Sequence, residues 1–255
     1  MSTDSSQAAT ARQLSTINLG IVSPMANEEP TAVPFVNAVL EQCALNGFKA
    51  VNFFAILDEK SRDNTRALLE TLAAKQPELH IVWAPETRCV AQAYVRGYKE
   101  ALAVGCDWIL EIDSGFSHQP ESMSQFFRKM LEGYDCVFGS RFCQGGRVTE
   151  SSLSRYVVSR GGTLLSNLLL GTSLRDMTSG FELFTHSSLQ YVLEKGIRSR
   201  SPFFQTEIRA YCHQFRIAEV PIHYRAASHK IDMAALGDSF SNLWRLFRLR
   251  LQGTL

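Results

Sequence analysis

The chain has 255 residues, of which 45% are hydrophobic and 20% charged, and its formal net charge at pH 7 is +1. This length and composition allow one large α/β domain with a full core and argue against a disordered chain. The near-neutral charge gives no sign of nucleic-acid binding through bulk positive charge, so any anion must be recognised by local Arg and Lys groups.

The cysteines and the N-terminus indicate the compartment. None of the six cysteines has CxxC spacing or a neighbouring His that would predict zinc, so we expect them to be reduced, in the cytoplasm. Residues 1–16 are small and polar, which predicts a disordered lead-in and not a secretory signal. No stretch reaches the roughly 18 apolar residues of a membrane span. If the substrate is a lipid, we expect a peripheral protein at the cytosolic face of a membrane.

Apolar runs alternate with amphipathic segments through the first half of the chain. We expect strands at residues 17–23, 50–57, 80–83, 108–113 and 134–139, and helices at 31–45, 63–75, 91–104 and 120–132. This alternation predicts an α/β fold with a mostly parallel sheet and helices on both faces.

The second half is less regular. We expect helices at residues 157–170 and 206–214 and strands at 180–185 and 217–224. Without repeats or an interior linker, a single domain over residues 17–236 is predicted. Residues 237–255 are expected to form an amphipathic C-terminal helix.

Polar side chains follow the first two predicted strands, where ligands bind in such sheets. Pro24, Asn27 and Glu28 come after the first strand, and Asp58 and Glu59 after the second. Adjacent acids at a strand end are suited to accept hydrogen bonds from a base and a ribose. The alternative for the first group is a turn and helix cap.

Asp113 ends the fourth predicted strand, where a carboxylate is placed to hold a divalent cation against a diphosphate. Glu111 lies two residues earlier on the same strand face, so it is either a substitute ligand or an exposed strand residue. His118, in the following turn, is expected to be a hydrogen-bonded turn histidine.

Basic residues follow the fifth strand and surround the start of the apolar helix. Arg141 comes directly after the strand, and Arg155, Ser159 and Arg160 lie near the helix start. Helix starts and arginines both bind phosphate, so a phosphate cradle is predicted; the alternative is a solvated basic face.

Apolar residues form a stripe on one face of the C-terminal helix. They are Phe240, Leu243, Trp244, Phe247 and Leu251. Such a helix rests in a bilayer interface or packs on the domain's own core or a dimer partner. In the first case, truncation after Asp238 is expected to remove liposome binding and leave the fold intact.

These motifs, in this order from about residue 17 to residue 230, resemble the family 2 glycosyltransferases of GT-A (Rossmann-like) fold, and within them the dolichol-phosphate mannosyltransferase branch. Residues 23–28 (SPMANE) resemble the family's IPxYNE, 58–65 (DEKSRDNT) its DDxSxDGT, and 93–97 (AYVRG) its AYxxG. The most specific match is 176–181 (DMTSGF) to DxTSGF. GSR at 139–141 and SRG at 159–161 precede it at the family's separation, FQTE at 204–207 and EVPI at 219–222 follow it, and HKI at 229–231 is similar to the family's closing SKL.

One departure concerns the metal. The family has Asp-Ala-Asp after the fourth strand, whereas this chain has Asp113-Ser114-Gly115, so Gly115 stands in place of the usual second ligand. One carboxylate with phosphates and water is enough for Mg²⁺ in many proteins. We therefore expect a weakened Mg²⁺ or Mn²⁺ site.

The resemblance implies an inverting transfer of a sugar, with mannose favoured, from a nucleotide-sugar to a polyprenyl or dolichyl phosphate. GDP-mannose is the favoured donor, and a membrane-anchoring partner subunit is a further expectation. The implied donor residues are Pro24, Asn27, Glu28, Asp58, Glu59, Asp113, Gln205, Glu207 and Lys230. The implied acceptor-phosphate residues are Arg141, Arg155, Ser159 and Arg160. Asp113, Asp176 and Arg141 are the implied catalytic residues, with a purely structural role as the alternative for Asp176.

The acceptor determines what the chemistry needs. A phosphate monoester is already anionic near neutral pH, because its second pKa is about 6, so no strong general base is required. A saccharide or protein acceptor would need such a base. A third alternative, prompted by Gly115, is a catalytically impaired protein that binds a nucleotide-sugar.

Overall fold

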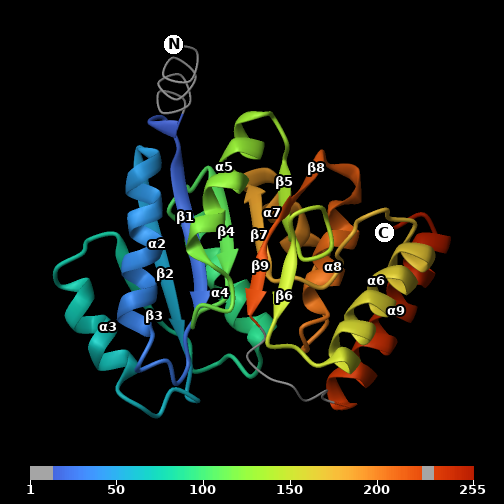
Figure 1. Ribbon diagram of the computed structural model, residues 1–255, viewed down its shortest axis with the longest axis horizontal. Helices are drawn as coiled ribbons and strands as arrows, with labels where there is room; N and C mark the ends of the chain where they lie inside the picture. Colours follow the sequence, from blue (N-terminus) through green and yellow to red (C-terminus); the bar gives the residue numbers. More distant parts are fainter. Residues whose placement is uncertain (1–13, 226–232) are drawn as a thin grey trace.

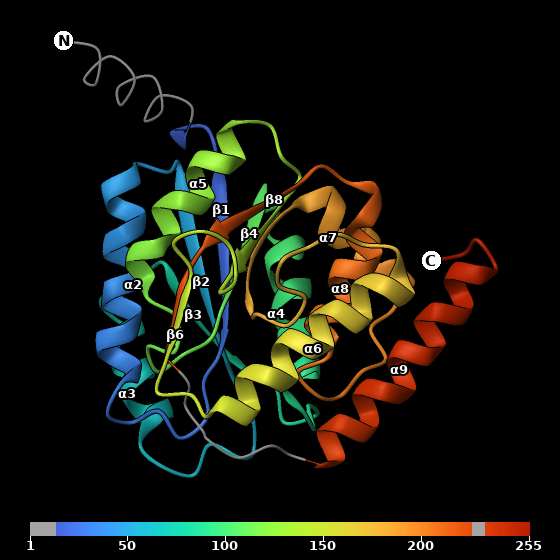
Figure 2. The same ribbon diagram turned by 45° about the vertical axis from the view of Figure 1, so that its right-hand side comes forward.

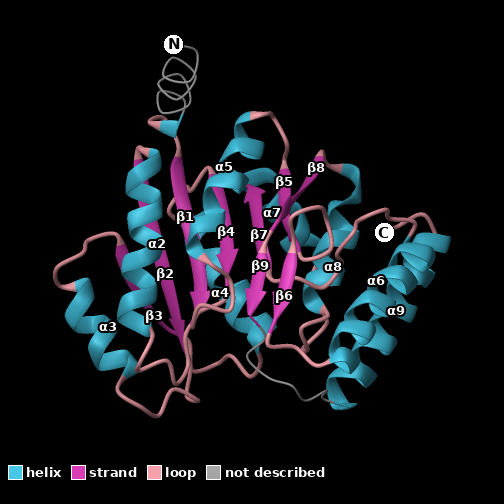
Figure 3. Ribbon diagram, viewed as in Figure 1, coloured by secondary structure: helices cyan, strands magenta, loops and turns pink. Residues whose placement is uncertain are grey.

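A seven-stranded sheet runs through the centre of the molecule, with helices on both of its faces (Figures 1 and 3). The computed structural model describes residues 14–225 and 233–255. Its strands are β1 (Asn18–Pro24), β2 (Ala50–Leu57), β3 (Leu79–Trp83), β4 (Trp108–Ile112), β5 (Cys136–Ser140), β6 (Arg147–Thr149), β7 (Phe181–Thr185), β8 (Ile217–Pro221) and β9 (His223–Arg225).

The helices alternate with these strands in the first half of the chain. They are α2 (Ala32–Asn46), α3 (Thr65–Ala73), α4 (Val90–Ala103), α5 (Met123–Leu131), α6 (Leu153–Leu170), α7 (His186–Lys195), α8 (Phe204–Tyr211) and α9 (Met233–Leu251), with 3₁₀ turns at Pro120–Ser122 and Cys212–Gln214.

The strand order is β3-β2-β1-β4-β7-β5-β8, and only β7 runs antiparallel to its neighbours. The predicted α/β fold with a mostly parallel sheet is therefore confirmed. Because β1, β2 and β4 are parallel and adjacent, the loops that follow them meet at one edge, the lower one in Figure 1.

Two apolar cores lie on the two faces of the sheet. Phe35 of α2 and Phe126 of α5 belong to the first, and Tyr94 of α4 and Phe204 of α8 to the second. Gly97 lets α4 lie close to the sheet, since a Cβ there would collide with Val22 of β1. This close contact brings the start of α4 next to the end of β4.

Several boundaries differ from those predicted. The expected strand at 217–224 is two strands, because β8 pairs with β5 in the main sheet, whereas β9 pairs with β6 in a separate two-stranded sheet. Helix α7 was not predicted; the Thr185 hydroxyl at the end of β7 accepts from the Ser188 backbone N–H (3.2 Å), so the helix begins with no connecting loop. Leu14, inside the expected lead-in, is fully buried in the core.

Helix α9 lies along α6 at one end of the molecule (Figures 1 and 2). Arg250 of α9 donates to the backbone carbonyls of Leu168 (3.2 Å) and Leu169 (2.8 Å), at the end of α6. The helix begins at Met233, so the expected domain boundary at residue 237 falls inside it. No helix in the described part of the chain is both long and apolar enough to cross a bilayer.

Candidate functional site

The loops after β1 and β2 are tied together at the carboxyl edge of the sheet. Asn27, with φ of +60°, donates through Nδ2 to the carbonyl of Lys60 (2.8 Å) and accepts through Oδ1 from the N–H of Arg62 (3.0 Å). Its amide thus joins two loops, so Asn27 shapes this edge from within the protein. Pro24 is half-buried at the end of β1.

The two acids after β2 have different surroundings. Asp58 is buried at the strand end, where its Oδ1 accepts from the backbone N–H of Lys60 (3.0 Å). Glu59 is exposed and forms an ion pair with Arg88 (3.1 Å), on the outer surface of the loop. Of the two, Asp58 has the position expected of a nucleotide-binding acid.

Asp113 lies just after β4 at the centre of the edge. Its Oδ1 accepts a hydrogen bond from the buried hydroxyl of Tyr94 (2.6 Å), and 37% of its side chain is exposed. Gly180 leaves room for it, since a Cβ there would lie 3.3 Å from Asp113 Oδ2 and would collide with the Gln205 amide. Gln205 therefore lies beside Asp113.

Burial raises the pKa of Asp113 to about 6; the hydrogen bond from Tyr94 opposes this rise, and the charge of Glu28 adds to it. Tyr94 stands in the AYxxG stretch of the sequence, but no role was predicted for it.

His118 lies behind Asp113 and is 1% exposed. Its Nδ1 is 3.6 Å from Asp113 Oδ2, and neither ring nitrogen has a hydrogen-bond partner within residues 14–225 and 233–255. Burial and the charge of Arg141 lower the pKa of His118 to about 3, so the ring is neutral at physiological pH. The expectation of a hydrogen-bonded turn histidine is therefore wrong, because the ring packs between Phe181 and Tyr224.

Arg141 and Asp176 form a buried, two-pronged ion pair. Arg141 Nε and Nη2 each lie 2.8 Å from a carboxylate oxygen of Asp176, and the Arg141 backbone N–H donates to Asp176 Oδ2 (3.0 Å). Nη2 also donates to Thr178 Oγ1 (2.5 Å). The N–H groups of Nη1 take no part in the contacts with Asp176 and Thr178. Burial alone would raise the pKa of Asp176, but Arg141 holds that pKa well below its usual range.

Three acids predicted to face a ligand lie inside the protein. Asp176 is fully buried and contacts Arg141, so the structural alternative describes it. Glu207 is fully buried and accepts from the backbone N–H of Ser199 (2.9 Å) and from Arg245 of α9, so its carboxylate faces the protein interior, and its assignment to the donor stays a prediction.

Glu111 is also fully buried, which agrees neither with an exposed strand residue nor with a substitute metal ligand, the two roles expected from the sequence. Tyr98 donates to its Oε2 and Gln205 to its Oε1 (3.3 Å), so it is neither exposed nor turned to a metal at the edge. Burial and the charge of Glu182 raise the pKa of Glu111 well above its usual value.

The basic residues that the sequence assigns to an acceptor phosphate lie where α6 begins. The helix starts at Leu153, earlier than predicted, so Arg155, Ser159 and Arg160 lie on its first turns. Arg160 donates to the carbonyl of Arg175 (3.0 Å).

An aromatic residue that was not predicted, Phe142, joins these basic groups. The guanidinium of Arg141 lies 5.1 Å from the centre of its ring and that of Arg160 lies 4.9 Å from it. Arg141 and the helix start are thereby joined at one place.

Tyr224 of β9, also not predicted, connects the two sides. Its ring centre lies 5.1 Å from that of His118 and 5.5 Å from the Arg141 guanidinium. Burial and the charge of Asp113 raise the pKa of Tyr224, while the charges of Arg155 and Arg141 lower it. Lys230, expected to cover the diphosphate, lies outside the described residues.

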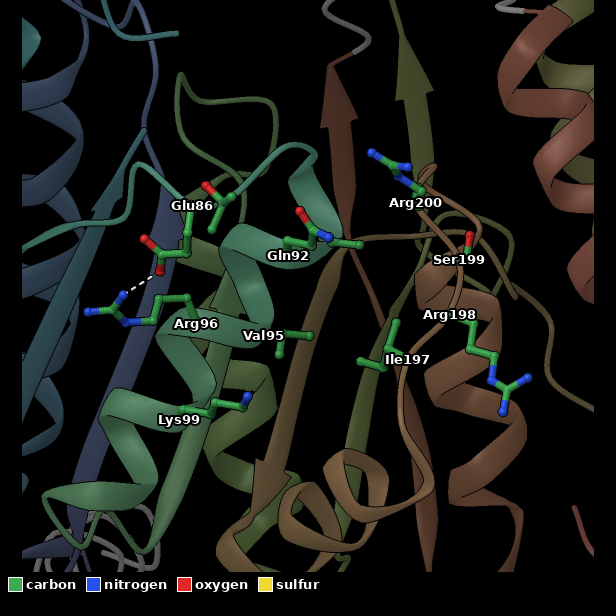
Figure 4. Close-up of a pocket in the computed structure, with 11 residues that line it drawn as sticks. Glu86, Gln92, Val95, Arg96, Lys99, Ile197, Arg198, Ser199 and Arg200 are labelled. Carbon is green, nitrogen blue, oxygen red and sulfur yellow. Dashed lines mark hydrogen bonds and ion pairs between the residues drawn. The ribbon is translucent and has the colours of Figure 1, made fainter. Parts of the chain in front are cut away.

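A hollow of about 300 Å³ lies outside this edge, between α4 and the segment that precedes α8 (Figure 4). Figure 4 shows Arg198 turned outward and Arg96 turned to Glu86, with Val95 and Ile197 between them. Among the described residues that line it, none was predicted for the site.

No three His, Cys, Asp or Glu side chains gather closely enough in the described ranges to hold a metal by themselves. A cation beside Asp113 would therefore need oxygen ligands from a bound diphosphate or from water.

Comparison with known proteins identifies relatives. A family model described as "Glycosyl transferase family 2" matches residues 20–193. The undecaprenyl-phosphate mannosyltransferase of Micrococcus luteus is 28% identical over 195 residues, which cover 74% of this chain and 80% of that protein. The polyprenol monophosphomannose synthase of Mycolicibacterium smegmatis is 30% identical over 172 residues, which cover 66% of this chain and 65% of that protein.

Among solved structures, glucosyl-3-phosphoglycerate synthase from Mycobacterium tuberculosis in complex with uridine diphosphate has a TM-score of 0.64 at 16% identity, over 95% of this chain and 83% of that chain. The same enzyme with Mn²⁺, uridine diphosphate and phosphoglyceric acid has a TM-score of 0.63 at 15% identity, over 96% and 81% of the two chains. At this identity the similarity shows the fold.

The environment of Asp113 predicts how it titrates. Carbon-detected NMR of the labelled carboxyl should give a pKa of about 6, above the ordinary 3.8. Tyr94→Phe should raise this pKa further, because it removes a hydrogen bond that favours the ionised form. Tyr134→Phe, at a distant half-buried tyrosine, is the control. A pKa near 4, or one that Tyr94→Phe leaves unchanged, would contradict this description.

Proposed function

The chain belongs to glycosyltransferase family 2, and from this premise we propose that it transfers mannose, with inversion, from a nucleoside-diphosphate sugar to a polyprenyl phosphate. The observation that carries the proposal is a chain of contacts around Tyr224, in which His118 lies against both Asp113 and Tyr224 and the Arg141 guanidinium lies over the Tyr224 ring. A negative group for the donor's cation and positive groups for a second anion thus lie close together. The names of the relatives, which are mannosyltransferases of polyprenyl phosphates, support the same reaction.

The chemistry needs little from the protein beyond positioning. A phosphate monoester is anionic near neutral pH and can attack the anomeric carbon directly. His118 is buried, and its pKa of about 3 makes it a weak base, so it is not suited to take a proton from an acceptor. What the residues supply is orientation of two anionic substrates and compensation of their charge.

On the donor side, we assign Asp58 to the nucleoside and Asp113 to the diphosphate end. A bound Mg²⁺ or Mn²⁺ would offset the charge of the leaving diphosphate. Gln205 lies beside Asp113, where it is placed to contact the sugar. The names of the relatives favour mannose, and GDP-mannose is the donor we propose.

On the acceptor side, we assign Arg155, Ser159 and the outer edge of Arg141 to the lipid phosphate. Ser159 and Thr178 line the wall of a hollow of about 370 Å³ between α6 and α9. Its other walls are mostly apolar, with Leu165, Phe203 and Leu243 among them. We propose that the first units of the polyprenyl chain leave the phosphate through this hollow.

Exposed apolar side chains on α6 and α9 support contact with a bilayer. Leu164 and Leu168 of α6 are 62% and 75% exposed, and Phe240 and Trp244 of α9 are 61% and 59% exposed. The predicted stripe on α9 is divided, because Leu243 packs into the domain while Phe240 and Trp244 do not. We propose peripheral attachment at the cytosolic face of a membrane, with a membrane-anchoring subunit as a further expected partner.

The transfer itself is tested with radiolabelled GDP-mannose and a short polyprenyl phosphate. Label should enter the organic phase with a divalent cation present, and mild acid should release it, as expected of a sugar phosphate. Excess chelator should abolish transfer, and turnover that continues unchanged would refute the metal requirement. Donor binding by calorimetry without turnover on any donor would instead indicate a nucleotide-sugar-binding protein.

Membrane attachment is best tested by point substitutions. The truncation after Asp238 is not a clean test, because it removes buried Leu246 and leaves Glu207 without Arg245. Phe240→Ser with Trp244→Ser should reduce binding to anionic liposomes severalfold in flotation assays, with an unchanged melting temperature. Leu45→Ser, at a residue of α2 that is 73% exposed, is the matched control. Equal binding by both variants would contradict the assignment.

A further inference from the structure

Gly115 stands against the carboxylate of Glu28. A Cβ at this glycine would lie 2.9 Å from Glu28 Oε2 and 3.3 Å from Oε1. Gly115 has φ of +71°, a conformation that Asp and Asn adopt more readily than other side chains. The space into which a side chain at residue 115 would point is therefore occupied by a carboxylate from another loop.

Glu28 is held in this position by contacts from three segments. Ser114 Oγ donates to its Oε1 (3.0 Å), Thr31 Oγ1 donates to its Oε2 (2.5 Å), and its backbone N–H donates to Thr65 Oγ1 (2.8 Å). Each carboxylate oxygen has two acceptor sites, so these bonds leave capacity for a cation. The group is half-buried and oriented before any ligand arrives.

The neighbouring groups indicate that a ligand belongs here. Ser114, the residue that follows Asp113, donates to Glu28 Oε1 (3.0 Å), so the Glu28 carboxylate lies against the turn that carries Asp113. Behind Asp113 lies His118, 1% exposed, with its Nδ1 directed at Asp113 Oδ2 from 3.6 Å and no hydrogen-bond partner among residues 14–225 and 233–255. Buried polar atoms without partners are rare and mark places where a further group is expected.

We propose that Glu28 supplies, with Asp113, the second carboxylate of the divalent-cation site, in place of the side chain that Gly115 lacks. Two carboxylates with phosphate and water oxygens fit Mg²⁺ and Mn²⁺, which do not require a cage made only of protein. The inference rests on the proposed transfer from a nucleotide-sugar. It differs from the sequence prediction, which assigned Glu28 to the nucleotide.

The experiment measures Mn²⁺ binding to the full chain in the presence of GDP by electron paramagnetic resonance, which does not depend on turnover. Glu28→Gln keeps the size of the side chain and its acceptor oxygen but removes the charge. It should weaken Mn²⁺ binding by about 10-fold or more. Gly115→Asp combined with Glu28→Ala, which empties the space that the Glu28 carboxylate fills, should restore most of that affinity, because it returns a carboxylate to the same space.

The matched control is Glu29→Gln. Glu29 belongs to the same loop but turns to α3, where it accepts from Asn64 Nδ2 (2.8 Å) and from the Asn64 backbone N–H (3.2 Å). Its Mn²⁺ affinity should equal that of the unaltered chain. Thermal melts of each variant confirm that the fold is intact.

The other possible results of the Mn²⁺ measurement separate failure of the Glu28 proposal from failure of the proposed transfer. Unchanged Mn²⁺ binding in Glu28→Gln overturns this inference and leaves the proposed function standing. If Mn²⁺ binding is weakened and Gly115→Asp does not restore it, Glu28 acts by connecting loops. That result overturns the proposal that its carboxylate takes the place of a side chain at residue 115. Failure of the unaltered chain to bind Mn²⁺ with either GDP or UDP contradicts the proposed metal-assisted transfer itself.

Discussion

The buried pair of Arg141 and Asp176 is the interaction on which the site depends. It joins the end of β5 to the turn before β7 through three hydrogen bonds to one carboxylate. Removing one partner of such a pair leaves an uncompensated buried charge, typically at a cost of about 3–5 kcal/mol. A second buried cation, Arg209, supports the turn from behind by donating to the carbonyls of Asp176 and Ser179 and by pairing with Glu182. The same turn holds Gly180 against Asp113 and Gln205. Asp113 and Arg141 are therefore both positioned by this turn.

This arrangement separates two kinds of charge. The acids that carry the support are inside the protein and matched by arginines, whereas Asp113 reaches the edge with a third of its side chain exposed. Along the path from Asp113 to Arg141 lie His118, which is neutral, and Tyr224. Asp113 and Arg141 therefore offer charges of opposite sign only a few side chains apart, which supports the proposed transfer between two phosphates.

The sequence predicted the alternation of strands and helices well, because apolar strands and amphipathic helices are local patterns. It also assigned Asp113 and Gln205 to the donor, and both lie next to Gly180. It did not predict the burial of Glu111 and Glu207, because acids are seldom fully buried and nothing local shows that Tyr98 or Arg245 will arrive as a partner. Tyr224 and Phe142 were missed because their roles come from contacts between distant segments. From the sequence, Gly115 indicated only the loss of a metal-binding carboxylate, whereas in the structure the carboxylate of Glu28 lies against it.

The central claim is that the acceptor is a phosphate and needs no general base. It is tested most directly by comparing transfer of label from GDP-mannose to a polyprenyl phosphate and to the polyprenol of the same length, with Arg155→Ala alongside. The account predicts product from the phosphate alone and a fall in kcat/KM of tenfold or more in Arg155→Ala. Comparable transfer to the alcohol, or a variant with an unchanged rate on the phosphate, would contradict it.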